Sequence, residues 1–184
     1  MKLYNIAEIN LCTEFEGPFK RLAIWFQGCN IRCEGCCNPE LQQLIPKHLI
    51  SLEEIIDIIK KSKSENDIEG ITLLGGEPTI QNDLVFLLER VRELDLGIIL
   101  FTGKQLSDVE SNVQSFCDII VDGKFDINQI ETERNLVGSK NQTIHYLTDR
   151  YVNCKDWFDV KRTKRARVDI VDDSLIISGD VIIR

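Results

Sequence analysis

Four cysteines lie within nine residues of one another, and their spacing is the clearest indication of chemistry in the chain. Cys29, Cys33 and Cys36 form the pattern C-x3-C-x2-C, and Cys37 follows directly. A structural zinc site would need a second C-x2-C pair or a histidine pair, and the two histidines of the chain are isolated. Three thiolates on one short loop can instead bind three irons of a 4Fe-4S cubane and leave the fourth iron open. An open metal position indicates chemistry at the metal, as it does in catalytic zinc sites.

This pattern resembles the signature of the radical S-adenosylmethionine enzymes. The resemblance implies that Cys29, Cys33 and Cys36 hold a 4Fe-4S cluster whose fourth iron binds S-adenosylmethionine, which is reductively cleaved to a 5'-deoxyadenosyl radical. That family usually has an aromatic residue where this chain has Gly35, but its anaerobic ribonucleotide reductase activators tolerate glycine there. A zinc-binding loop or a chance group of thiols is the alternative. Cys37 could pack against the cofactor, serve as a spare ligand or have no role.

A second motif, Gly75-Gly76-Glu77-Pro78, follows an apolar run further along the chain. Its two glycines let the backbone approach a ligand closely, and Pro78 suits the start of a helix. The motif resembles the G-G-E-P segment with which radical S-adenosylmethionine enzymes bind the amino group of the cofactor. We therefore expect cofactor contacts from Gly75, Gly76, Glu77 and Pro78, and from Gly35, Cys36 and Cys37 on the other side.

Two later segments resemble the activators of anaerobic ribonucleotide reductase in particular. Residues 122–125 are similar to their V-D-G-[KR]-F segment, and residues 136–144 are similar to their G-S-x-N-Q-x-[IV] segment. We expect Thr102, Asp122 and Lys124 to contribute to the cofactor site. For Asp122 and Lys124, a solvated turn is an equally good interpretation.

The elements that must position these motifs alternate between strands and helices. Apolar runs predict strands at 22–26, 70–74, 98–102 and 119–121. Helical spacing predicts helices at 52–64, 84–94 and 107–116, the first capped at Ser51 to Glu54 and the last at Ser107 to Glu110. This alternation predicts an α/β fold with a mostly parallel sheet, in which the motifs meet at the carboxyl ends of the strands. The resemblance implies a partial open (βα) barrel of the radical S-adenosylmethionine type.

Composition limits the classes of partner. The chain has 184 residues, enough for one domain with a small extension, and a net charge of -8. Such a charge repels nucleic acid, although a local basic run lies at 161–167. No apolar stretch is long enough to span a membrane, and acids stand where a signal peptide would be apolar. We therefore expect a cytoplasmic protein with no nucleic-acid or membrane partner, in which the remaining cysteines, Cys12, Cys117 and Cys154, are small buried hydrophobes.

The C-terminal part of the chain lies beyond the resemblance. We divide the chain into a radical S-adenosylmethionine core at 1–148 and a C-terminal β extension at 149–184. Apolar residues alternate on both sides of Asp172-Asp173, which predicts a β-hairpin or a small meander. This extension could cover a sheet edge or dock a partner.

The leading hypothesis from these patterns is an enzyme that generates a glycyl radical on a partner protein. The resemblance implies a class III anaerobic ribonucleotide reductase as that partner and a flavodoxin- or ferredoxin-like reductant. One alternative keeps the radical chemistry but has a peptide, nucleoside or small metabolite as substrate. Another is a non-enzymatic zinc or iron-sulfur binding module.

Overall fold

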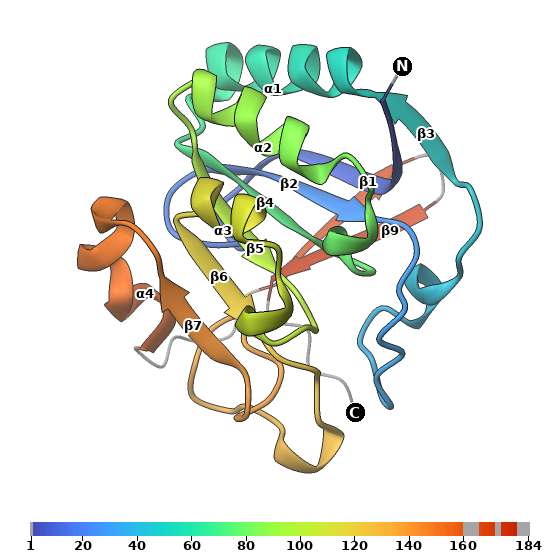
Figure 1. Cartoon of the computed structure of the whole chain (residues 1–184), viewed down its shortest axis with the longest axis vertical. Helices are drawn as coiled ribbons and strands as arrows, with labels where there is room; N and C mark the ends of the chain where they lie inside the picture. The colour runs from blue at the N-terminus through green and yellow to red at the C-terminus, as the bar shows by residue number, and fades with distance from the viewer. Residues whose placement is uncertain (1, 160–165, 172–173, 180–184) are drawn as a thin grey trace.

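The computed structural model describes residues 2–159, 166–171 and 174–179, and its main feature is one seven-stranded sheet (Figure 1). The spatial order of the strands is β3-β1-β2-β4-β5-β6-β7. Strands β2, β4, β5 and β6 run parallel to one another, whereas β1, β3 and β7 are antiparallel to their neighbours. The strands are β1 (Leu3–Thr13), β2 (Arg21–Phe26), β3 (His48–Ser51), β4 (Gly70–Gly75), β5 (Gly97–Phe101), β6 (Ile119–Asp122) and β7 (Thr143–Tyr146).

The four parallel strands are the four that the apolar runs predict, and the α/β class is confirmed. No sequence pattern predicted β1. Polar residues interrupt its alternation, and each of the two register shifts in its pairing with β2 breaks the two-residue period. Among the described residues, β3 and β7 end the sheet with one neighbour each, so the sheet is open. The barrel curvature implied by the family resemblance stays a prediction.

Three helices accompany the parallel strands, namely α1 (Leu52–Asn66), α2 (Leu84–Glu93) and α3 (Ser111–Phe116). The first begins at the expected capping box, in which Ser51 and Glu54 bond each other's backbone N–H groups. The start predicted for the third helix is wrong. Residues 106–108 form a 3-10 turn instead, because the carboxylate of Asp122 accepts the N–H of Leu106 at 2.6 Å and holds that segment against the sheet.

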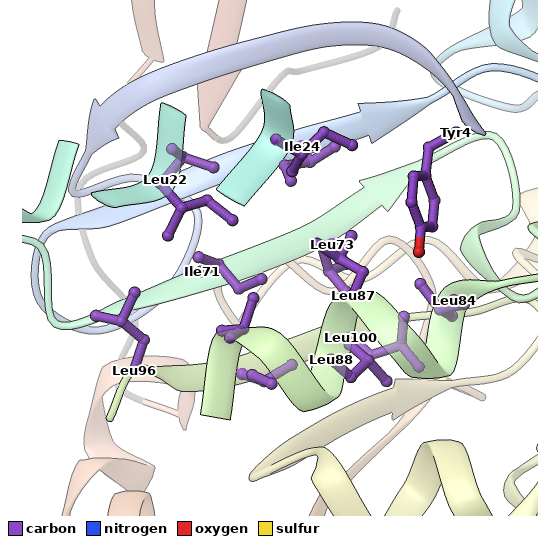
Figure 2. Packing of buried hydrophobic residues seen from close by; sticks show 14 of the residues in the cluster. Tyr4, Leu22, Ile24, Ile71, Leu73, Leu84, Leu87, Leu88, Leu96 and Leu100 are labelled. Atoms are coloured by element: carbon purple, nitrogen blue, oxygen red, sulfur yellow. The ribbon is translucent and has the colours of Figure 1, made fainter. Parts of the chain in front are cut away.

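Helices α1 and α2 cover one face of the sheet and form the main hydrophobic core with it. Figure 2 shows Leu73 of β4 close to Leu87 of α2, with Tyr4 of β1 at the end of the same cluster. These side chains are completely buried, and burial of each such apolar side chain contributes about 1.5–3 kcal/mol to stability. No helix in the described part of the chain is long and apolar enough to cross a membrane.

Packing on the other face continues past residue 148. Residues Asp149–Cys154 form a 3-10 helix and residues Lys155–Asp159 form α4. Within them, Tyr151 and Phe158 are completely buried in a second cluster with Ile99 of β5. The segment from 149 to 159 is therefore packed against the sheet, on the face opposite α1 and α2.

The predicted C-terminal hairpin is confirmed. Strands β8 (Ala166–Val171) and β9 (Ser174–Gly179) pair antiparallel over their whole length. The basic residues at 161–165, the turn at Asp172-Asp173 and the apolar residues 181–183 lie outside the described residues.

Candidate functional site

The loops that follow β2, β4, β5 and β6 surround one cavity of about 350 Å³. In Figure 1 the blue loop after β2 and the yellow to orange loops between β6 and β7 lie on the lower side of the sheet. The residues that sequence patterns assigned to the site and that line the cavity are Cys29, Cys33, Cys36, Cys37, Gly75, Gly76, Glu77 and Thr102. Gly35, Pro78, Asp122 and Lys124 are not among the lining residues. These loops converge at the carboxyl ends of the parallel strands, which is where α/β sheets bind ligands.

The cysteine loop leaves β2 at Gln27 and is held at its base. The side-chain amide of Gln27 donates to the carbonyl oxygen of Gln43 at 2.8 Å, and the N–H of Gly28 donates to the carbonyl oxygen of Leu41 at 2.8 Å. Gly28 has φ +98°, a conformation that side chains disfavour. These contacts fix the two ends of the loop relative to each other, so the thiols between them project from a defined base.

The thiols differ in exposure and in acidity. Cys29 is buried, Cys33 and Cys36 are half-buried and Cys37 is exposed, and all are free thiols. A hydrogen bond from the Cys37 thiol lowers the pKa of Cys36 to about 6, and the same bond raises the pKa of Cys37. Burial raises the pKa of Cys33, while the N–H of Phe125 and the charge of Lys124 act in the opposite direction. Because thiolates bind metals, a lowered pKa favours Cys36 as a metal ligand.

The donor set fits an iron-sulfur cluster. Four free thiols from one loop, three of them in the C-x3-C-x2-C pattern, line the same cavity and present sulfur, the donor that iron-sulfur clusters take from proteins. Within residues 2–159, no three His, Cys, Asp or Glu side chains are placed to share a single metal ion. A cubane does not need such convergence, since each thiolate binds a different iron.

The Gly75-Gly76 turn brings the end of β4 against the cysteine loop. The N–H of Gly76 donates to the carbonyl oxygen of Phe26, and the N–H of Glu77 donates to that of Gly28, both at 2.8 Å. A side chain on Gly76 would collide with the Gly28 carbonyl, and Gly75 has φ +111°. Both positions therefore require glycine for this approach, whatever else the backbone binds.

Glu77 is buried, and its carboxylate is fully engaged with neighbouring loops. It accepts hydrogen bonds from the hydroxyls of Thr79 at 2.7 Å and Thr102 at 2.8 Å, and from the N–H of Gly103 at 2.8 Å. These bonds join the loop after β4 to the loop after β5. The carboxylate thus positions two walls of the cavity, and the Thr102 hydroxyl is used in the same contact.

The Asp122 carboxylate is buried at the end of β6. Besides the Leu106 N–H, it lies 3.1 Å from Nε2 of His145 on β7. Lys124 is exposed, and Asn141 donates to its carbonyl oxygen at 2.8 Å. In this arrangement Asp122 ties neighbouring segments together, and Lys124 acts on the cysteine loop through its charge.

Gly35, between two of the cysteines, also has a structural reason to be glycine. Its φ is +69°, and a side chain there would collide with the Ile127 side chain. The departure from the usual aromatic residue is therefore accommodated by an isoleucine from the loop after β6.

Several lining residues were missed by sequence reasoning, among them Trp25, Glu131 and Arg134. Trp25 could have been found, because it alternates along β2 with residues that face the helices. Glu131 and Arg134 carried no local signal. Burial alone would raise the pKa of Glu131, but the N–H of Glu133 and the guanidinium of Arg134 outweigh it and lower the pKa to about 2.

The fold and the site together define a class of iron-sulfur protein. An open α/β sheet carries three cysteines in cluster-binding spacing at the carboxyl edge of its parallel strands. Residues 15–145 match the family described as 4Fe-4S single cluster domain, and the chain belongs to that family. Among its relatives is the anaerobic ribonucleoside-triphosphate reductase-activating protein of Vibrio cholerae serotype O1, 31% identical over 143 residues that cover 72% of this chain and 91% of the relative. The protein of the same name from Enterobacteria phage T4 is 29% identical over 153 residues, 79% of this chain and 96% of the relative. The chain also matches the 7-carboxy-7-deazaguanine synthase of Methanopyrus kandleri at 26% identity over 137 residues, 63% of this chain and 54% of the relative. The expected resemblance to the reductase activators is confirmed.

Proposed function

We propose that this protein is a radical S-adenosylmethionine enzyme that generates a glycyl radical on a partner of the anaerobic ribonucleotide reductase type. The observation that carries the proposal is the cavity that Cys29, Cys33 and Cys36 line together with Gly75 and Gly76. The names of the relatives from Vibrio cholerae and phage T4 support the choice of partner.

The three cysteines would hold the cluster and leave one iron without a protein ligand. When bound, the reduced 4Fe-4S cluster supplies one electron that cleaves S-adenosylmethionine into methionine and a 5'-deoxyadenosyl radical, which takes a hydrogen atom from a glycine of the partner. A flavodoxin- or ferredoxin-like protein would deliver the electron.

The chain itself would orient the cofactor and exclude water. Gly75 and Gly76 present peptide groups to the cavity without side chains, so a ligand amino group can approach the backbone. Trp25, Phe101 and Phe125 supply apolar walls, and exclusion of water protects a reactive radical from side reactions. The remaining opening would be closed by the polypeptide of the partner.

The test is anaerobic reconstitution with iron and sulfide, followed by dithionite and S-adenosylmethionine, with 5'-deoxyadenosine measured by chromatography. The wild-type protein is expected to form it, and Cys33→Ala is expected to form none. Cys154→Ala is the matched control, since Cys154 is a half-buried thiol that does not line the cavity. Stoichiometric zinc with no reducible cluster would overturn the proposal.

The partner is tested separately by electron paramagnetic resonance. Mixing the reduced protein with an anaerobic ribonucleotide reductase is expected to produce a glycyl doublet. The match to a 7-carboxy-7-deazaguanine synthase favours, as a second candidate, radical chemistry on a small molecule. Formation of 5'-deoxyadenosine without a doublet on any glycyl-radical partner would favour that second function.

A further inference from the structure

The segment 138–142, hereafter the clamp, binds the backbone of residues 123–127, hereafter the β6 loop. Nε2 of Gln142 donates to the carbonyl oxygen of Gly123 at 2.9 Å. Nδ2 of Asn141 donates to the carbonyl oxygen of Lys124 at 2.8 Å. Consecutive polar side chains of the clamp therefore satisfy consecutive carbonyls of the loop.

A third polar side chain and a glycine of the clamp complete the contact. The Ser139 hydroxyl, which is completely buried, accepts the N–H of Asp126 at 3.1 Å. At Gly138, a Cβ would lie 3.0 Å from the ring of Phe125, so the glycine lets the ring pack against the backbone. All four fixed letters of the G-S-x-N-Q pattern thus contact the β6 loop, three through side-chain hydrogen bonds and the glycine through packing.

The clamp is itself held rigidly. Oε1 of Gln142 accepts the N–H groups of Gly138 and Ser139 at 2.9 and 3.0 Å. The guanidinium of Arg134 donates to the Gln142 carbonyl at 2.8 Å and is held by the buried Glu131 at 2.6 Å. A rigid support can impose a defined position on the loop that it holds.

The other side of the β6 loop lies against the cysteine loop. The Ile127 side chain occupies the space beside Gly35, and Phe125 lines the cavity together with Cys33. The Phe125 N–H also forms a hydrogen bond with the Cys33 thiol. The β6 loop is therefore the element that connects the clamp to the thiols.

We propose that Ser139, Asn141 and Gln142 are positioning residues for the cluster: they hold the β6 loop so that Phe125 and Ile127 fix the Cys33 side of the cysteine loop. Hydrogen bonds to cysteinyl sulfur and access of solvent set the reduction potential of an iron-sulfur cluster. The clamp would thereby tune that potential without touching the cluster. That the group with the tuned potential is a 4Fe-4S cluster rests on the proposed function, whereas the positioning of the β6 loop by the clamp does not.

The test compares Gln142→Met with Gln114→Met. Both variants replace an amide by an uncharged side chain of similar length, but Gln114 donates to the carbonyls of Leu106 and Val109, in a loop that does not line the cavity. In the cluster-free protein, Gln142→Met is expected to speed hydrogen exchange at 123–127 and 33–36 by about fivefold to tenfold, the effect of losing roughly one hydrogen bond. In the reconstituted protein, its cluster potential is expected to shift away from the wild-type value, while Gln114→Met keeps that value.

Exchange at 33–36 that stays at the wild-type rate, or a potential that moves no further than in Gln114→Met, would overturn the inference. If Gln142→Met does not fold, the same measurements are made on Asn141→Ala. Asn141 is exposed, and this variant loses only the hydrogen bond to the Lys124 carbonyl oxygen. A wild-type protein that takes up no cluster would contradict the proposed function, and the exchange measurement alone would then test the positioning.

Discussion

The two ends of the parallel strands differ in how their polar groups are satisfied. At the amino end, the completely buried Arg21 donates to Thr72 at 2.8 Å, to the Ile71 carbonyl at 2.6 Å and to the Tyr151 hydroxyl at 2.9 Å, and it pairs with Glu69 at 3.1 Å. The polar groups there satisfy one another, as buried charges require.

At the carboxyl end, the buried carboxylates are also satisfied, but they hold the walls of a cavity that the cysteine thiols line. Glu77 accepts hydrogen bonds from the loop after β5, and Glu131 accepts one from Arg134 of its own segment; both carboxylates lie at the cavity. The cysteines between those walls have no disulfide partner. The comparison teaches that the amino end contributes mainly stability, whereas the carboxyl end positions side chains around a cavity.

The largest effect is expected from deletion of residues 149–184, which removes part of the amino end. Tyr151 and Phe158 are completely buried, and loss of one large aromatic side chain from a core costs about 3–5 kcal/mol. A domain of this size has a total stability of about 5–15 kcal/mol, so the chain 1–148 is expected not to fold. Circular dichroism and urea titration measure this. A cooperative transition near that of the full chain would instead support the division at residue 148.

Arg21→Ala is expected to destabilise the folded chain by about 3–5 kcal/mol, because the Ile71 carbonyl and the Thr72 and Tyr151 hydroxyls lose a buried charged donor. Urea denaturation of the cluster-free protein measures the loss. Lys20→Ala is the control, since Lys20 is exposed and donates to one exposed carbonyl. Equal stabilities of the two variants would contradict the role assigned to the amino end.

At the carboxyl end, Glu131 makes stability depend on pH. Its pKa is lowered from 4.5 to about 2, so its ionised form stabilises the fold above pH about 4.5, and this contribution is lost as the pH falls toward 2. The shift corresponds to about 3 kcal/mol. Glu131→Gln is expected to flatten the dependence of the unfolding free energy on pH between about pH 5 and 2, the range between the unfolded and folded pKa values of Glu131. Glu133→Gln, at an exposed position, is expected to keep the wild-type slope, and a matching slope in both variants would refute the assignment.

Gly76→Ala is expected to cost about 1–3 kcal/mol, since a methyl group there meets the Gly28 carbonyl oxygen and separates two loops of the cavity. Gly103→Ala is a suitable comparison, because its Cβ would lie 3.1 Å from the Ile31 side chain, which can move. Thermal denaturation of both variants measures the difference. A tolerated alanine at Gly76 would show that the loops approach less closely than described.

The residues that line the site were easier to predict from the sequence than the long-range contacts that hold those residues in place. The parallel strands, the cysteine loop and the Gly75-Gly76 turn follow local patterns, because each depends on residues close together in the chain. Arg21 and Tyr151 lie 130 residues apart, and nothing local indicates that they meet. The fixed letters at 138–142 could be matched to a family, but their bonds to 123–126 depend on tertiary structure.

The smallest effect on folding is expected from a change that abolishes the proposed chemistry. Cys33 is half-buried and has no disulfide partner, so Cys33→Ser in the cluster-free protein is expected to change the free energy of unfolding by less than about 0.5 kcal/mol. Cys117→Ser replaces a completely buried thiol in the main core and is expected to cost about 1–3 kcal/mol, because the hydroxyl enters an apolar environment. After reconstitution the variant with the larger effect is the other one. Cys33→Ser is expected to lose the cluster absorbance, and Cys117→Ser is expected to keep it. The same order in both measurements would mean that the thiols of the loop serve the fold, and that the two ends of the strands do not divide stability from chemistry.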